Sequence, residues 1–341
     1  MSGDSELPNK RFRFRGLLGA CLKAVGIALV LAAALGAIYQ AIATARDSRE
    51  YPPPGRLIDV GGHRLHLQVT GEDHAGPTVL LEAGMASFST NWYGVQTALA
   101  ASSPVVSYNR AGLGWSEPGP MPRDARRSAE ELHIALERAG INAPYVFAGH
   151  SYGGLVARAF TDLYPTEVVG MVLVDASHPD QWAHIPSSLG GHVPGASSRV
   201  LSVLSWFGLL RAVDMITPQV AAGLPPAEYT QMKAIFALPR SSAVAADGLA
   251  VWDELTRPQV NGARTLSDLP LAVLSVTEQP LYGEVLTALQ SELPGLSSNS
   301  MQRIVVGATH ENLISDREHA NVVADTIREV VAGARTGTRL Q

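Results

Sequence analysis

The sequence predicts an α/β fold with a mainly parallel sheet, and three observations support this prediction. Between residues 78 and 310, six short β-branched runs are separated, for the most part, by stretches of helix length. Such alternation is typical of a parallel sheet with helices on both faces. The motif GHSYG at 149–153 stands between an apolar, strand-like run and a helix-forming run. The N-terminus joins basic residues to a long apolar stretch, so we expect a separate helix before the folded domain.

The N-terminal segment has the composition of a membrane anchor. Residues 1–23 are basic, and the following residues 24–43 are almost all apolar. About 20 apolar residues span a bilayer as a helix, and flanking basic residues tend to stay on the cytoplasmic side. We therefore expect 1–23 in the cytoplasm, a single-pass transmembrane signal-anchor at 24–45, and the remainder of the chain outside the cytoplasmic membrane.

Two other interpretations of this segment stay open. Ala43 and Ala45 form a small-x-small site after an apolar region, so signal cleavage near Ala45 would give a secreted protein. A buried core helix is the second interpretation, although basic residues crowd one end of the segment and the sequence YPPPG follows it. In each case residues 46–55 are expected to form a polar, proline-rich linker, because proline cannot continue a helix.

The folded core is expected at 56–177 and 267–335. It opens with two alternating runs joined by a Gly-Gly pair, which predicts a β-hairpin. A covering helix is predicted before the strand that leads to GHSYG, and it stops at Gly140. The closing helix is predicted to begin at Ser315 or Asp316, because either side chain can cap its first turn.

Residues 178–266 interrupt the alternation of strands and helices, and we expect them to form a helical lid. The stretch SSRVLSVLSWFGLLRAVDMIT within them is apolar on more than one face. A helix of that kind must be buried, or must cover an apolar cavity or a membrane surface. Several aromatic and Met side chains of this insertion either line an acyl pocket or form the lid's own core, and the core is favoured: Trp182, Trp206, Phe207, Met215 and Trp252.

The composition excludes some classes of function. The 26 basic and 31 acidic side chains offer no basic surface of the kind that nucleic acid needs. Cys21 is the only cysteine, so no internal disulfide can form. No spacing of His, Asp or Glu suggests a metal, and the glycines near residue 151 lack the Lys and Ser/Thr of a phosphate-binding loop. No cofactor is therefore predicted, and the oligomeric state stays open.

Ser151 is the candidate nucleophile. It follows the run YVFAG and precedes the run YGGLVARAF, a strand-turn-helix setting in which a serine is exposed on a strained turn. Gly149 and Gly153 leave room where strand and helix come close. A serine hydroxyl attacks well only when a neighbouring base takes its proton and a carboxylate orients that base. The chain must therefore supply a histidine and an acid.

With these residues the chain resembles the α/β-hydrolase family, over nearly all of residues 57–333. Besides GHSYG, the resemblance rests on LLEAG before NWYGV, on YNRAGLGWSEPG, on YPTEVVGMVLVDAS and on a histidine near the end of the chain. It implies the α/β-hydrolase fold with a lid over the site, in a serine esterase or lipase-like branch. It also implies that the acid and then the histidine follow the nucleophile in sequence.

The resemblance implies roles for the remaining site residues. His310, in the loop after the last strand, is the expected base, whereas His319 falls in the first turn of the closing helix and is expected at the surface. Asp175, at the end of GMVLVDAS, is favoured as the acid, with Glu278 in VTEQP as the alternative. The backbone amides of two further residues are expected to form the oxyanion hole: Met85 and Tyr152.

Together these residues predict a serine hydrolase that cleaves carboxylic esters through an acyl-enzyme. Apolar acyl groups are preferred, because the lid is apolar and the domain would lie near lipid; the substrate would be a small-molecule or lipid-like ester. In the family that the chain resembles, epoxide hydrolases and haloalkane dehalogenases use Asp as the nucleophile. A serine at position 151 therefore argues against these two activities. An amidase, a peptidase or an acyltransferase with the same site stays open, as does a non-catalytic binding protein.

Overall fold

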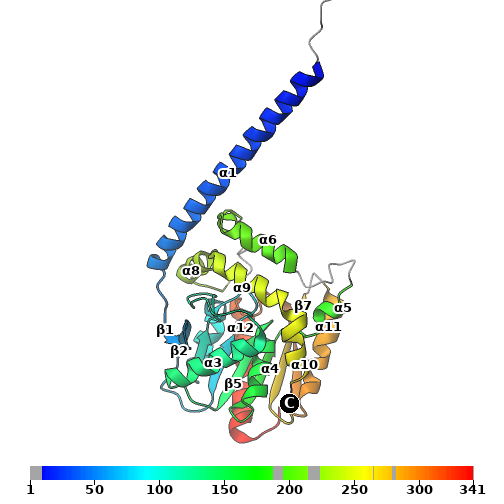
Figure 1. The fold of residues 1–341 in the computed structure, drawn as a ribbon. Coiled ribbons are helices and arrows are strands. Elements are labelled where there is room, and N and C mark those ends of the chain that lie inside the picture. The colour runs from blue at the N-terminus through cyan, green and yellow to red at the C-terminus, as the bar shows by residue number, and fades with distance from the viewer. Residues whose placement is uncertain (1–9, 187–194, 214–222, 264, 279–281, 341) are drawn as a thin grey trace, which may run out of the picture.

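An eight-stranded sheet forms the centre of the protein (Figure 1). The computed structural model describes residues 10–186, 195–213, 223–263, 265–278 and 282–340. The strand order is β1-β2-β4-β3-β5-β6-β7-β8. The strands are β1 Arg56–Asp59, β2 Arg64–Thr70, β3 Thr78–Glu82, β4 Val105–Tyr108, β5 Tyr145–His150, β6 Val168–Val174, β7 Leu271–Glu278 and β8 Ser300–Thr309.

The sheet is mainly parallel, as the sequence predicts. β1 pairs antiparallel with β2 and β2 antiparallel with β4, whereas the pairs from β4 through β8 are all parallel. The carboxyl ends of six parallel strands therefore meet at one edge of the sheet, and the loops that follow them lie close together there.

The central strands are apolar along most of their length because both faces of the sheet are covered. In β3, Val79 and Leu81 belong to one core cluster and Leu80 to the other. In β5, Phe147 packs on the same side as Leu80. Since successive side chains of a strand point to opposite faces, a strand that lies between two helical layers needs apolar residues at every position.

Four helices supply these two layers. The first layer holds α3 Ala125–Ala139 and α4 Gly153–Leu163, and the second holds α2 Tyr93–Leu99 and α12 Arg317–Thr336. Their ends follow local signals: the Asp124 side chain accepts from the Arg127 amide, and Gly140 ends α3 in the left-handed region. Asp316, and not Ser315, caps α12 by accepting from two amides. The connections hold η1 Ser89–Trp92, α11 Gly283–Glu292 and η4 Leu293–Leu296.

The insertion at 178–266 is helical wherever it forms regular structure in the described residues. Its elements are α5 Gln181–His184, α6 Gly195–Ser205, α7 Leu209–Ala212, α8 Pro226–Phe236, α9 Pro239–Ala250, the π-helix η3 Trp252–Thr256 and α10 Arg257–Asn261. Met232, Ile235 and Leu238 pack on Phe88 and Trp115 of the core domain. The insertion therefore covers the loops at the carboxyl edge of the sheet.

The aromatic residues of the insertion divide into two groups. Trp252 is buried in the first core cluster, and Trp182 packs against it. They are core residues, but they belong to the core of the α/β domain and not to a core of the lid alone. Trp206 and Phe207 instead keep 57% and 42% of their surface exposed, so the expectation that they are core residues is wrong. Met215 lies outside the described residues.

The N-terminal helix α1, Lys10–Glu50, projects from the domain (Figure 1). From Leu18 onwards it is long and apolar enough to cross a membrane, with a mean hydropathy of 2.3 in its most apolar window, none of which is buried. That exposure argues against the buried core helix. The helix continues to Glu50, so only residues 51–55 of the expected linker lie outside it.

Candidate active site

Ser151 occupies the turn between β5 and α4 in a strained backbone conformation, with φ of +54°. The two flanking glycines make that turn possible. A Cβ at position 149 would lie 2.5 Å from the carbonyl oxygen of Gly153, and one at position 153 would lie 2.4 Å from that of Glu82. Only glycine leaves room for such close backbone approaches. The turn presents Ser151 at the carboxyl edge of the sheet.

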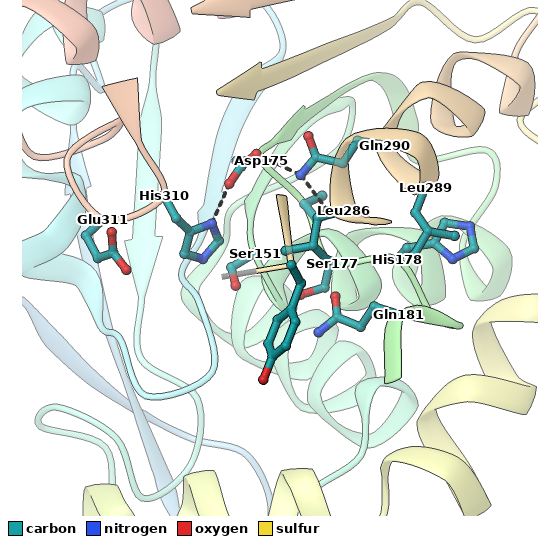
Figure 2. A pocket seen from close by; sticks show the side chains of 12 residues that line it. Ser151, Asp175, Ser177, His178, Gln181, Leu286, Leu289, Gln290, His310 and Glu311 are labelled. Carbon is teal, nitrogen blue, oxygen red and sulfur yellow. Dashed lines mark hydrogen bonds and ion pairs between the residues drawn. The ribbon is translucent and has the colours of Figure 1, made fainter. Parts of the chain in front are cut away.

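Ser151 and His310 both line one cavity of about 230 Å³. Figure 2 shows the Ser151 hydroxyl beside the imidazole ring of His310. Leu286 and Leu289 of α11 contribute apolar surface to the same cavity. Among the described residues no group of three or more His, Cys, Asp or Glu side chains could hold a metal ion. The cavity therefore combines a hydroxyl, an imidazole and an apolar wall.

His310 is joined to Asp175 by a hydrogen bond of 2.5 Å between Nδ1 and Oδ2 (Figure 2). His310 follows β8, and Asp175 follows β6 with a φ of +42°. The Asp175 side chain is 1% exposed, whereas His310 keeps 39% of its side chain exposed. Because Nδ1 donates to the carboxylate, Nε2 carries the free lone pair when the ring is neutral.

The other oxygen of Asp175 is held by Gln290 of α11. Gln290 Nε2 donates to Asp175 Oδ1 over 2.7 Å and also contacts the carbonyl oxygen of Ala176 at 3.4 Å. The carboxylate is thus fixed from both sides. Gln290 carried no sequence signal, because an isolated Gln on a helix 115 residues after Asp175 belongs to no motif.

The pair shifts both pKa values toward the charged forms. Burial alone would lower the pKa of His310, but the hydrogen bond and charge of Asp175 outweigh it and raise that pKa above its ordinary 6.5. Burial also opposes the ionisation of Asp175, yet the bonds and charge from His310, together with Gln290, keep its pKa below 3.8. The arrangement favours an imidazole that accepts a proton beside a carboxylate that stays ionised.

The alternative residues lie elsewhere. Only the backbone of Glu278 is described, and it pairs with Thr309 at the end of β7; its side chain lies outside the described part of the chain. His319 stands in the first turn of α12, with Nδ1 3.7 Å from Asp316 Oδ1. It is only 16% exposed, so the expectation of a surface position is wrong. The carboxylate that contacts His310 is Asp175.

The expected oxyanion amides belong to the loop after β3 and to Tyr152, the residue before α4. A Cβ at Gly84, next to Met85, would lie 3.3 Å from Ser151 Cβ. Neither the Met85 nor the Tyr152 amide donates a backbone hydrogen bond among the described residues. Arg110 Nη1 donates to the Ala83 carbonyl over 2.6 Å, and Nη2 donates to the Met85 carbonyl over 3.0 Å. A buried ion pair with Glu82 holds the guanidinium in turn. Arg110 thereby fixes the loop that carries the Met85 amide.

The His150 ring holds the backbone of His310 through a hydrogen bond. Its Nε2 lies 2.9 Å from the His310 carbonyl oxygen, so this nitrogen must donate. The His150 ring stands edge-on to Trp92 and 4.6 Å from the ring of His310. Burial and the charge of His310 lower the pKa of His150 to about 3, so it stays neutral. The adjacency of His150 to Ser151 is visible in the sequence, but its bond to a residue 160 positions later is not.

Comparison with known proteins agrees with the resemblance to α/β hydrolases. Residues 77–203 match a family described as "alpha/beta hydrolase fold". The chain is 36% identical over 136 residues to "Probable transporter efuK" of Hormonema carpetanum and 34% identical over 141 residues to "AB hydrolase superfamily protein" of Gibberella zeae. Each match covers 38% of this chain, and the chain spans only 20% and 44% of these two relatives.

Solved structures share the fold over most of this chain. An epoxide hydrolase, CorEH, superposes with a TM-score of 0.61 at 16% identity, and an esterase from Thermogutta terrifontis superposes with a TM-score of 0.58 at 20% identity. Each comparison covers 81% of this chain and 98% of the other. At these identities the likeness concerns the fold, and the chemistry must be argued from the site itself.

Proposed function

Because the chain belongs to the α/β-hydrolase fold family, we propose that it is a serine hydrolase that cleaves carboxylic esters through Ser151, His310 and Asp175. The observation that carries the proposal is the 2.5 Å bond between Asp175 and His310 in the cavity that Ser151 also lines. Nucleophile, acid and base then follow one another in the chain in the order that the family resemblance implies.

The site residues support a two-step mechanism. His310 Nε2 takes the hydroxyl proton as Ser151 Oγ attacks the ester carbonyl, and Asp175 stabilises the imidazolium that forms. The Met85 and Tyr152 amides hold the oxyanion of the tetrahedral intermediate. His310 returns the proton to the leaving alcohol, which yields the acyl-enzyme. Water, deprotonated by His310, then releases the carboxylic acid and restores Ser151.

Ester cleavage fits this nucleophile better than epoxide opening, although epoxide hydrolases share the fold. A serine oxygen that opened an epoxide would form an ether with the substrate. Water activated by a histidine does not hydrolyse an ether. The enzyme would stop after one turnover. A serine that attacks an ester forms another ester, which the same base can hydrolyse. Ser151 therefore favours acyl transfer.

The proposed acyl groups are apolar. Leu286 and Leu289 line the cavity next to Ser151, and contact with apolar chains removes their surface from water. His178 and Gln181 line the same cavity (Figure 2) and provide polar groups for the alcohol portion. A series of p-nitrophenyl esters of increasing chain length tests this preference; faster cleavage of the acetyl ester than of every longer one would contradict it.

Covalent labelling tests the class of enzyme. A fluorophosphonate should label the wild type at Ser151 and leave Ser151→Ala unlabelled, and an unlabelled wild type would support the non-catalytic binding protein instead. Matched p-nitrophenyl esters and p-nitroanilides separate an esterase from an amidase or peptidase. Added alcohol acceptors reveal an acyltransferase, because the acyl group would then appear on the alcohol and not as free acid.

We also infer that α1 anchors the protein, with residues 1–23 cytoplasmic and the hydrolase domain outside the cytoplasmic membrane. The basic N-terminus and the exposed apolar helix support this topology. Protease added to spheroplasts should digest the domain, and a domain that only lysis exposes would contradict it. Secretion after cleavage near Ala45 predicts a shortened chain in the medium.

A further inference from the structure

The lid carries an exposed apolar surface that the active site does not use. Helices α6 and α7, the turn between them and the residue that ends α7 hold six large apolar side chains that are each 41–59% exposed: Val200, Val203, Leu204, Trp206, Phe207 and Val213. The opposite side of α6 packs against α9. A contiguous apolar surface of this kind marks a site of contact with a protein or a membrane.

This lid surface adjoins the membrane helix α1. Gly36 of α1 lies so close to the lid that a Cβ there would stand 2.5 Å from the carbonyl oxygen of Phe207. A Cβ at Gly208 would stand 3.2 Å from the ring of Tyr39. The two glycines thus allow α1 and the α6–α7 turn to touch backbone to backbone, and the exposed apolar residues of the lid continue the apolar surface of α1.

Polar contacts fix α1 to the lid at this junction. The Gln40 side chain, 3% exposed, donates to the Ala237 carbonyl over 3.0 Å and accepts from Arg211 Nε over 3.0 Å. Arg211 Nη1 also pairs with Asp47 Oδ2 at 2.6 Å. A buried Gln and a buried Asp are costly unless they are bonded, and their partners here are lid residues. These bonds therefore fix the position of the lid along the axis of α1.

The contact between the lid and α1 lies within the apolar segment 24–43 of α1. Gly36, against Phe207, precedes the end of the segment at residue 43 by seven positions. At a rise of about 1.5 Å per residue, Phe207 stands about 10 Å inside that end. Interfacial amphipathic helices lie about 5–10 Å deep in the boundary between headgroups and acyl chains. Aromatic residues are enriched at the same level, where the lid places Trp206 and Phe207.

A cavity of about 580 Å³ lies between α1 and the lid beside this contact. Its wall includes Ala37 and Ala41 of α1 and Trp206, Phe207 and Leu238 of the lid. At this depth the surrounding medium would be hydrocarbon, so an acyl chain of a bilayer lipid fills such a space without loss of hydrogen bonds.

We propose that the α6–α7 surface of the lid inserts into the interfacial layer of a phospholipid bilayer, with lipid acyl chains filling the cavity beside α1. The proposal rests on α1 as a membrane anchor and is independent of the reaction at Ser151. It makes the lid a part of the membrane-bound surface, so that the hydrolase domain has one fixed orientation on the bilayer.

Trp206 is a natural reporter for this arrangement. It is the only one of the five tryptophans with a largely exposed side chain, and none lies in α1. The full-length protein is reconstituted into phosphatidylcholine vesicles, with or without bromine on the acyl carbons nearest the headgroup. Brominated lipid should quench part of the tryptophan fluorescence of the wild type, and this quenched part should be missing in Trp206→Phe. It amounts to at most one fifth of the emission if the five tryptophans emit equally.

A matched control places a tryptophan away from the bilayer. Glu137, 66% exposed near the end of α3, lies at the opposite end of the sheet from the lid. In a Trp206→Phe/Glu137→Trp variant, aqueous acrylamide and not brominated lipid should quench the new tryptophan. The proposal is overturned if acrylamide alone quenches Trp206, or if the chain is recovered without α1. Fluorophosphonate labelling in the same vesicles reports separately on the proposed hydrolase activity.

Discussion

Replacing Asp175 by Asn is the sharpest perturbation of the proposed triad. Asp175 Oδ2 accepts from His310 Nδ1 over 2.5 Å, and Oδ1 accepts from Gln290 over 2.7 Å. An Asn side chain has nearly the same shape, but it offers one acceptor and one NH₂ group. If the NH₂ faces His310, Nδ1 must accept, and the proton then sits on Nε2, where the base should be free.

The expected loss in kcat is about 10⁴-fold, the size that a serine protease shows for the equivalent change. The pH profile changes as well. Neutral His310 is the base, so kcat/KM rises with pH through the pKa of His310. In the wild type this midpoint lies above 6.5, because Asp175 raises that pKa. Burial is the largest single influence on this pKa, and without the carboxylate the hydrogen bond and charge of Asp175 no longer offset it. The pKa of His310 then falls, so the midpoint of the residual activity moves to lower pH.

The assay is steady-state hydrolysis of a p-nitrophenyl ester as a function of pH, with thermal unfolding as a check on the fold. Glu278→Gln is the matched control, because it removes the alternative acid and should leave kcat within a few-fold of the wild type. An Asp175→Asn variant with kcat within tenfold of the wild type refutes the reasoning, as does a Glu278→Gln variant with the larger loss.

Further substitutions test the support of the site. Gln290→Leu removes the bond from Gln290 to the buried Asp175 Oδ1, so the free energy of unfolding should fall by about 1–3 kcal/mol in urea titrations; an unchanged free energy would mean that this bond contributes nothing. Gly153→Ala puts a Cβ 2.4 Å from the Glu82 carbonyl oxygen and should cost about 1–3 kcal/mol, whereas Gly295→Ala, which meets open space, should leave the melting temperature nearly unchanged. Met85→Pro removes an oxyanion donor and should reduce kcat by about 10²–10³-fold, while Met85→Ala keeps the amide and most of the activity; equal losses in both variants would place the effect in the side chain.

The fold class could be predicted because its signals are local. Uninterrupted apolar runs such as the one in β5 follow from burial on both faces, and Gly140 and Asp316 mark helix ends through their own backbone chemistry. Ser151 stood out for the same reason, since the strained turn requires glycines two residues to either side of it. Such signals extend over only a few residues, so they can be recognised in the sequence alone.

The support of the site could not be predicted because its contacts are long-range. Asp175 follows β6 and Glu278 ends β7, two strands that are neighbours in the sheet, and each residue was a candidate partner for His310. The structure brings Asp175 Oδ2 to His310, while the catalytic roles themselves stay predictions. Gln290 and His150 have partners 115 and 160 residues away, and no motif records such pairs.

The sequence by itself determined the parallel sheet, the exposed serine turn and an apolar N-terminal helix, because hydrophobic period, glycine and charge act locally. The tertiary structure decided which carboxylate contacts His310, since only the order of the strands sets which loops meet. It also decided that the apolar lid residues Trp206 and Phe207 stand beside α1 and not in a core. The reason is the packing of Gly36 and Gln40 against the lid, a contact between segments about 170 residues apart.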